Sequence, residues 1–211
     1  MNLTVKLTLR ISFLLLFAGP LVIAQQQRPL AVDKDLPIPL LQIDSSGQLI
    51  IKASPASSSQ DFDYLLGKWR LRNSKLRCRL NGCTDWTPEF ESFVENERVL
   101  GGLGNIDKYF ENVNKEPFHG LAVRLFDTKT KLWNIYWADG SGNVLDAPLT
   151  GSFDHGVGHF FGRDTYKGKP IIVVFRWDVR NPQLPVWSQA FSADNGKTWE
   201  WNSINVSERI F

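Results

Sequence analysis

Four polar residues interrupt otherwise apolar stretches of this sequence, and their types suit the binding or orientation of a small molecule. They are Arg124, Tyr136, Arg176 and Gln189. A polar side chain that points into an apolar interior is costly unless a partner or a ligand satisfies it. A buried arginine would pair with a carboxylate such as Glu200 or Asp139, or would contact an anionic ligand through two hydrogen bonds. The alternative is that these residues face outward or belong to structural networks.

Large aromatic residues lie beside these polar positions and are candidates for the lining of a cavity. They are Trp133, Trp137, Phe175 and Trp177. A strand with one solvent-facing side should alternate apolar and polar residues, yet residues 171–175 are apolar on both faces. This pattern predicts a wall covered by the N-terminal segment or by a second copy in a homodimer, or an apolar lumen that holds a small ligand.

Histidines offer a weaker signal for a metal ion or a haem. His155 and His159 are four residues apart, which places both on one face of a strand. The third histidine, His119, is distant in the sequence. Three scattered histidines do not define a ligand set, so no metal site and no cofactor are predicted, and haem or metal binding is kept as an alternative.

Other motifs indicate structure rather than catalysis. The glycine clusters at 101–104 and 156–158 lack the third glycine and the following helix of a nucleotide-binding loop, so strand bulges explain them better. No Gly-x-Ser-x-Gly nucleophile motif is present. Residues 192–199 match the Asp-box of sialidase propellers, but a single copy predicts a tight hairpin and not a glycosidase.

The N-terminus predicts export. Residues 1–24 combine two basic residues, a short apolar run and a terminal Ala24, as in a cleaved signal peptide. No later apolar stretch is long enough to span a membrane. Loss of Lys6 and Arg10 with this segment leaves 22 basic and 22 acidic residues. That balance argues against nucleic acid as a partner and, with export, predicts a soluble periplasmic or secreted protein.

The two cysteines fit an exported protein. Cys78 and Cys83 flank four residues that end in the turn dipeptide Asn81-Gly82. Such a loop places the two side chains opposite each other, so a disulfide is expected in an oxidising compartment.

The chain divides into three parts. Residues 25–60 are rich in Pro, Ser and Gln and read as an extended linker or pro-region, and residues 61–211 form the folded domain. Within that domain, apolar runs alternate with turn residues every 8 to 12 positions, a pattern typical of all-β folds. Strands are expected near 68–79, 84–94, 96–101, 106–113, 119–127, 131–138, 143–153, 157–166, 170–178, 185–192 and 198–208. About ten strands joined by successive hairpins favour an antiparallel up-and-down barrel over a two-sheet sandwich.

Several segments together resemble an exported bacterial family of unknown function within the lipocalin-like (calycin) superfamily. The matching segments are residues 62–69, 125–127, 133–139, 175–177 and 189–200. The resemblance extends over about residues 61–208. It implies a closed lipocalin-like barrel with an internal cavity, and it implies no particular reaction.

These observations favour an exported barrel that binds a small, largely apolar or amphipathic ligand. The aromatic candidates would contact the ligand, and Arg124, Tyr136 and Arg176 would orient its polar end. One alternative is an enzyme, such as an isomerase, a cyclase or a hydrolase, that uses an acid or base among Tyr136, Asp139 and Asp164 in the same cavity. Another is an interaction module that acts through the outer wall of the barrel.

Overall fold

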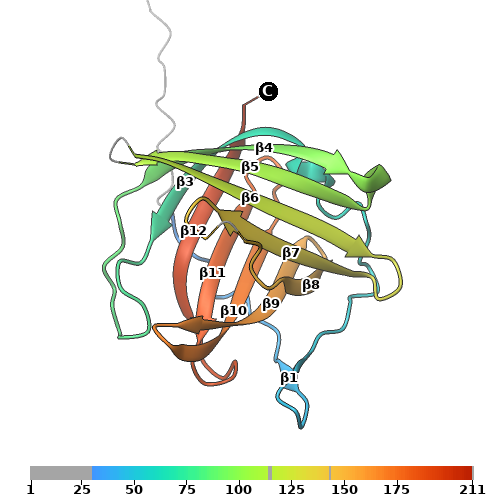
Figure 1. The fold of residues 1–211 in the computed structure, drawn as a ribbon, viewed down its shortest axis with the longest axis vertical. Helices are drawn as coiled ribbons and strands as arrows, with labels where there is room; N and C mark the ends of the chain where they lie inside the picture. The colour runs from blue at the N-terminus through green and yellow to red at the C-terminus, as the bar shows by residue number, and fades with distance from the viewer. Residues whose placement is uncertain (1–29, 114–115, 143, 211) are drawn as a thin grey trace, which may run out of the picture.

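The computed structural model describes residues 30–113, 116–142 and 144–210, and these residues form an all-β protein. Ten antiparallel strands close into one barrel, and a small two-stranded hairpin lies outside it (Figure 1). The predicted signal peptide, residues 1–24, lies outside the described residues. No helix in the described part of the chain is long and apolar enough to cross a membrane.

The described elements follow one another along the chain. They are β1 (Gln42–Ile43), β2 (Leu49–Ile50), the 3₁₀ helix η1 (Asp63–Leu65), β3 (Gly67–Lys75), β4 (Phe90–Val99), the 3₁₀ helix η2 (Leu100–Gly102), β5 (Gly104–Val113), β6 (Glu116–Asp127), β7 (Leu132–Asp139), β8 (Leu149–Asp154), β9 (Val157–Tyr166), β10 (Lys169–Asp178), β11 (Val186–Ser192) and β12 (Glu200–Arg209). The longest connection within the barrel, residues 76–89, lies between β3 and β4.

The strand order confirms the predicted up-and-down barrel. Each strand from β3 to β12 pairs with its neighbours in sequence, and β12 pairs with β3 to close the wall. Two strand predictions were wrong in detail. Residues 90–99, which were predicted as parts of two separate strands (84–94 and 96–101), form the single strand β4, whereas residues 84–89 lie in the connection before it and residues 100–101 belong to η2. Strand β8 begins only at Leu149, directly after Pro148, which has no N–H for a ladder hydrogen bond.

Aromatic side chains close one end of the barrel. Phe62 is 1% exposed and packs edge-on against Trp133, Phe153 and Trp177, with ring centroids 5.0, 5.0 and 5.4 Å away. The indole N–H of Trp69 donates a 2.6 Å hydrogen bond to the carbonyl of Leu65. These contacts fix residues 62–69 across the base of the barrel, which we call the closed end.

Arg209 ties the last strand to the closed end. Its guanidinium donates to the carbonyls of Leu66 and Tyr64 at 2.5 and 2.8 Å and lies 4.3 Å from the centre of a Trp69 ring.

Because charged hydrogen bonds and a cation–π contact are lost together, we expect Arg209→Met to lower the free energy of unfolding by about 2 kcal/mol. Urea denaturation measures this loss. The control Arg163→Met, at an exposed arginine with no bonded partner in the described chain, should change it by less than about 0.5 kcal/mol. If both variants lower the free energy of unfolding equally, Arg209 does not stabilise the closed end.

The N-terminal segment packs along the outside of the barrel as a strap, which we define as residues 30–60. Apolar strap residues cover the outer faces of β9, β10 and β11. They are Ile38, Leu41, Leu49 and Ile51, and they pack against Phe161, Val174 and Ala190. The described part of the predicted linker is therefore ordered on the barrel, and it explains why β10 is apolar on both faces.

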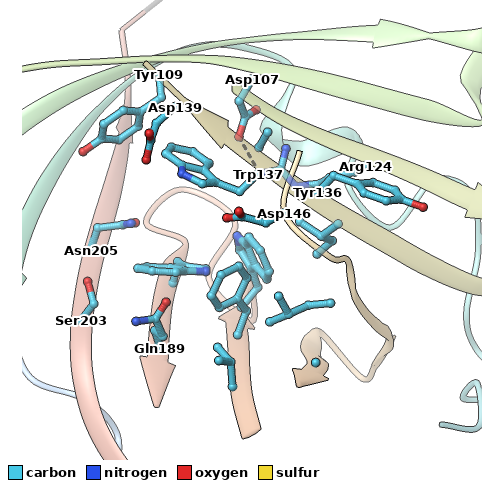
Figure 2. Close-up of a pocket in the computed structure, with 18 of the residues that line it drawn as sticks. Asp107, Tyr109, Arg124, Tyr136, Trp137, Asp139, Asp146, Gln189, Ser203 and Asn205 are labelled. Atoms are coloured by element: carbon cyan, nitrogen blue, oxygen red, sulfur yellow. Dashed lines mark hydrogen bonds and ion pairs between the residues drawn. The ribbon is translucent and has the colours of Figure 1, made fainter. Parts of the chain in front are cut away.

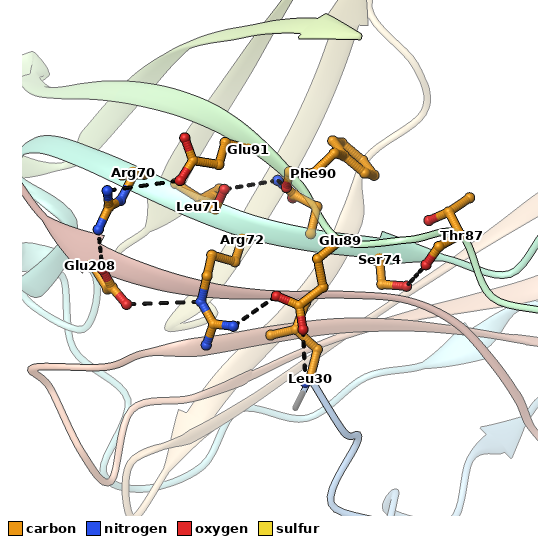
Figure 3. Close-up of polar contacts among 11 residues, drawn as sticks. Leu30, Arg70, Leu71, Arg72, Ser74, Thr87, Glu89, Phe90, Glu91 and Glu208 are labelled. Carbon is orange, nitrogen blue, oxygen red and sulfur yellow. Dashed lines mark hydrogen bonds and ion pairs between the residues drawn. The ribbon is translucent and has the colours of Figure 1, made fainter. Parts of the chain in front are cut away.

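The strap begins beside a set of charged side chains on the outer faces of β3, β4 and β12 (Figure 3). Arg72 contacts Glu89 at 2.8 Å, and Arg70 contacts Glu208 at 2.7 Å. The backbone N–H of Leu30 donates to the Glu89 carboxylate at 3.4 Å. This side of the wall is thus polar where it faces solvent, in contrast to the side beneath the rest of the strap.

Two local predictions are confirmed. Cys78 and Cys83 form a disulfide, with their Cα atoms 5.7 Å apart, in the loop between β3 and β4. Residues 192–199 form the tight connection between β11 and β12, in which the Asp194 carboxylate accepts hydrogen bonds from the backbone of Lys197 and Thr198. Hydrogen bonds, chiefly from Thr198, lower the pKa of Asp194 to about 2. The carboxylate therefore stabilises the turn.

Candidate functional site

The barrel encloses a cavity of about 580 Å³. Leu65 and Trp69 line its inner part near the closed end, and Lys75, Asp139 and Asp164 line it at the opposite end, which we call the open end. Figure 2 shows that labelled side chains from strands on different sides of the barrel converge on this space. The cavity is therefore a place where a small molecule can be surrounded by side chains of the barrel.

Aromatic and aliphatic side chains make up much of the lining. They are Leu65, Trp69, Leu71, Val94, Tyr109, Phe118, Ala122, Ile135, Trp137, Leu149, Val173, Phe175, Trp177, Trp187 and Phe191. The rings of Phe175 and Trp187 meet edge-on at 5.1 Å, and those of Tyr109 and Trp137 at 5.7 Å. Flat aromatic walls of this kind favour ligands with rings or long apolar chains.

A buried polar network lies in the inner part of the cavity. Arg124 donates to Asp107 at 2.5 Å and to Asn105 at 2.9 Å. Asn96 donates to the same two residues, at 2.5 Å to Asp107 and 3.0 Å to Asn105. The side chains of Arg124 and Asp107 are only 5% and 10% exposed, and both line the cavity. This ion pair supplies charge and hydrogen bonds in a mostly apolar environment.

Three carboxylates line the open end. They belong to Asp139 at the end of β7, Asp146 in the following loop and Asp164 in β9. Burial raises the pKa of Asp146, and the negative charges of Asp164 and Asp139 raise it further. In contrast, hydrogen bonds from Ser141 lower the pKa of Asp139. The open end therefore holds one carboxyl group that retains its proton to a higher pH than its neighbour.

A polar strip from β11 and β12 faces these carboxylates (Figure 2). Gln189 donates to Asn202 at 2.7 Å. Ser203 is 6% exposed, and neither its side chain nor that of Asn205 has a hydrogen-bond partner within the described residues. These two residues can therefore form hydrogen bonds with a ligand without breaking bonds within the protein.

The cavity includes six of the eight residues proposed from sequence. They are Arg124, Tyr136, Trp137, Phe175, Trp177 and Gln189. The ring of Tyr136 extends away from the other labelled side chains, so this residue contributes only an edge of the lining (Figure 2). The expectation that a buried arginine pairs with a carboxylate is confirmed for Arg124, but its partner is neither of the two examples, Glu200 and Asp139. Arg124 pairs with Asp107, whereas Glu200 accepts a hydrogen bond from the backbone of Leu80.

The other two proposed residues lie outside the cavity. Trp133 is buried in the aromatic cluster of the closed end, where its indole N–H donates to the carbonyl of Ser58 at 3.1 Å. Arg176 faces outward beneath the strap and donates to the carbonyls of Leu36 and Asp33, each at 2.8 Å. Phe175 and Trp177 face the lumen, so the residue between them must face the opposite side.

The histidine pair also lies away from the cavity. His155 is exposed in the turn before β9 and contacts Asp154 at 3.1 Å, whereas the partly buried His159 stacks on Phe161. Within the described residues, no group of three or more His, Cys, Asp or Glu side chains could hold a metal ion.

Sequence reasoning missed several residues that the cavity brings together. Asp107, Asp146, Ser203 and Asn205 are among them. Asp107 and Asn105 lie on the lumen face of β5, opposite Ala122 and Arg124 of β6. A polar residue at every second position of residues 105–111 was a signal for a lumen-facing polar row, but it is indistinguishable in sequence from a solvent-facing one.

A closed ten-stranded antiparallel barrel with a plugged end and an internal cavity defines this chain as a lipocalin-like β-barrel. It is similar to the structure of an S-type phycobiliprotein lyase from Guillardia theta, with a TM-score of 0.51 and 13% sequence identity, over 74% of this chain and 94% of that chain. At this identity the similarity extends to the fold alone. No protein-family model matches the chain, and no curated protein matches it in sequence.

Proposed function

We propose that this protein is an exported carrier that binds a largely apolar or amphipathic small molecule inside its barrel. The observation that supports this function best is the cavity of about 580 Å³, with aromatic walls and a few polar side chains free to bond a ligand. Barrels of eight to ten strands are wide enough to hold one small ligand. A barrel of similar fold serves as a phycobiliprotein lyase in Guillardia theta.

Export is the second part of the proposal. The N-terminal 24 residues have the composition of a signal peptide. The Cys78–Cys83 disulfide is compatible with an oxidising compartment. Detection of a mature chain that starts near Gln25 in the periplasm or the medium would support export. A full-length chain retained in the cytoplasm would contradict it.

A cavity-filling substitution tests the binding site. Ser203 lines the cavity, so Ser203→Phe should place a ring in the space that a ligand would occupy. We expect the affinity for the apolar fluorophore pyrene to fall at least tenfold, measured from the vibronic band ratio of pyrene emission. The matched control is Thr165→Phe, at an exposed position of β9 that does not line the cavity.

Three outcomes are informative for the carrier. Binding to the wild type and the control, but not to Ser203→Phe, supports a ligand site within the barrel. No binding of pyrene to the wild type, or equal binding to all three proteins, would overturn it. Native mass spectrometry of protein purified from its own host would then identify the natural ligand as a mass that is lost on denaturation.

A further inference from the structure

Arg124 retains hydrogen-bonding capacity at the inner end of the cavity. A guanidinium has five N–H donors. One from each terminal nitrogen is used, for Asp107 and for Asn105. The remaining three donors have no partner among the described residues. The Nε atom is fully buried and does not face the cavity, which leaves one donor on each terminal nitrogen for the lumen that Arg124 lines. Arg124 is only 4% exposed, and a donor that is shielded from water without a partner costs free energy, so these terminal donors favour an additional acceptor.

The charge of Arg124 is already balanced. The Asp107 carboxylate lies 2.5 Å from its guanidinium. The guanidinium carbon also lies 5.0 Å from the centre of the Phe62 ring and 5.5 Å from a Trp177 ring. A ligand carboxylate would bring a second negative charge close to Asp107 in an environment of low polarity, where like charges repel strongly. An uncharged acceptor avoids that repulsion.

The side chains around Arg124 indicate which kind of chemical group lies next to the acceptor in the ligand. Trp69, Ile135 and Trp177 line the cavity around the network, and they offer contacts to an apolar body. The complementary group is thus an acceptor oxygen attached directly to a ring or an apolar chain.

We propose that Arg124 donates a hydrogen bond to an uncharged carbonyl-type oxygen at the inner end of the ligand. The assignment rests on the proposed carrier function. It restricts the ligand class to apolar aldehydes, ketones, esters, amides or quinone-like compounds, and it excludes free fatty acids that insert with the carboxylate leading.

A series of probes with one ring system tests the assignment on the wild-type protein. The probes are pyrene, 1-pyrenecarboxaldehyde and 1-pyrenecarboxylate, and each dissociation constant is measured by fluorescence titration. A hydrogen bond from a charged donor should make the aldehyde bind about tenfold more tightly than pyrene. The emission of the bound aldehyde should also shift to the red relative to that of the aldehyde in an apolar solvent, because its carbonyl accepts a hydrogen bond. The carboxylate should bind more weakly than the aldehyde.

A double variant assigns the effect to Arg124. The change Arg124→Met together with Asp107→Leu removes both charges, so neither is left buried alone. It should abolish the preference for the aldehyde, while pyrene itself still binds. The control Lys68→Met plus Glu95→Leu removes an exposed ion pair from the outer wall and should leave the preference unchanged.

The outcomes separate the two proposals. If no probe binds, the carrier function fails. If pyrene binds and the aldehyde binds no more tightly, or if the carboxylate binds most tightly, the carrier function stands and the carbonyl assignment is overturned. Retention of the aldehyde preference in the double variant would also overturn the role of Arg124.

Discussion

Replacement of Asp107 by leucine is expected to lower the free energy of unfolding by about 3–5 kcal/mol, the largest single effect that we predict. Asp107 is the only carboxylate in contact with the Arg124 guanidinium among the described residues. Arg124 is 4% exposed, so the variant leaves a cation in the barrel without a counter-charge. Urea denaturation followed by tryptophan fluorescence measures the change.

The second half of the experiment is a rescue. Addition of Arg124→Met to Asp107→Leu removes the unpaired cation, and apolar residues of similar volume often replace a buried ion pair at little cost. We expect most of the lost stability to return. The matched control is Glu95→Leu on the outer wall, where the pair with Lys68 is about half exposed and should contribute less than about 1 kcal/mol. A loss in Asp107→Leu no larger than in this control, or no rescue, would contradict a buried unpaired guanidinium.

Acid is expected to weaken the protein between about pH 6.5 and pH 4 because of His159. Burial, followed by the charge of Arg176, lowers the pKa of His159 from 6.5 to about 4. Its Nε2 atom is buried without a hydrogen-bond partner in the described chain. Arg176 is its cross-strand neighbour on β10 and is held by carbonyls of the strap. A proton on His159 would therefore place a second positive charge beneath the strap.

The direction follows from proton binding in the two states. Above pH 6.5 both states leave His159 neutral, so the pH has no effect through this group. Between pH 6.5 and about 4 the unfolded chain binds a proton that the folded protein does not, so stability falls as the pH falls. Below about pH 4 both states are protonated and the loss levels off. The total is about 3 kcal/mol, since one pKa unit corresponds to about 1.4 kcal/mol.

Chemical denaturation at half-unit pH intervals tests this prediction. His159→Gln cannot gain the charge. Between pH 6.5 and pH 4 its free energy of unfolding should therefore fall less than that of the wild type, and the difference should equal the total given above. His155→Gln is the control, since the side chain of His155 is 90% exposed. Carboxylates whose pKa values are lowered, such as Asp194 at about 2, lose their contributions mainly below this interval. Parallel curves for the wild type and His159→Gln would show that His159 is protonated equally in both states.

Much of the fold could be predicted from short-range signals. The turn residues Asn81-Gly82 and Asn195-Gly196 mark connections that the structure contains, and Asn195, Gly196 and Gly82 have the positive φ angles that such turns need. The disulfide followed from the four residues between the cysteines. The barrel followed from the regular spacing of the strands. These features depend on residues close together in the chain, which is why the sequence alone revealed them.

The candidate site was predicted less completely, because its members come from distant strands. Arg124 and Arg176 have the same local pattern, a single arginine among large apolar residues. Arg124 enters the lumen and Arg176 faces outward to the strap. The local pattern could not separate them, since the strap makes the outer face of β10 as apolar as its lumen face. A shift of one residue in register exchanges the two faces of a strand.

Hydrophobic spacing, turn chemistry and cysteine spacing are local properties of the chain, so the antiparallel barrel could be inferred from the residues alone. Which polar groups share the cavity depends instead on how distant strands pair. The β5–β6 register brings Asp107 beside Arg124 across 17 positions of sequence, and barrel closure places Ser203 and Asn205 opposite Asp139 and Asp146. Such contacts depend on strand pairing and on the path of the strap, which are set by packing over the whole chain.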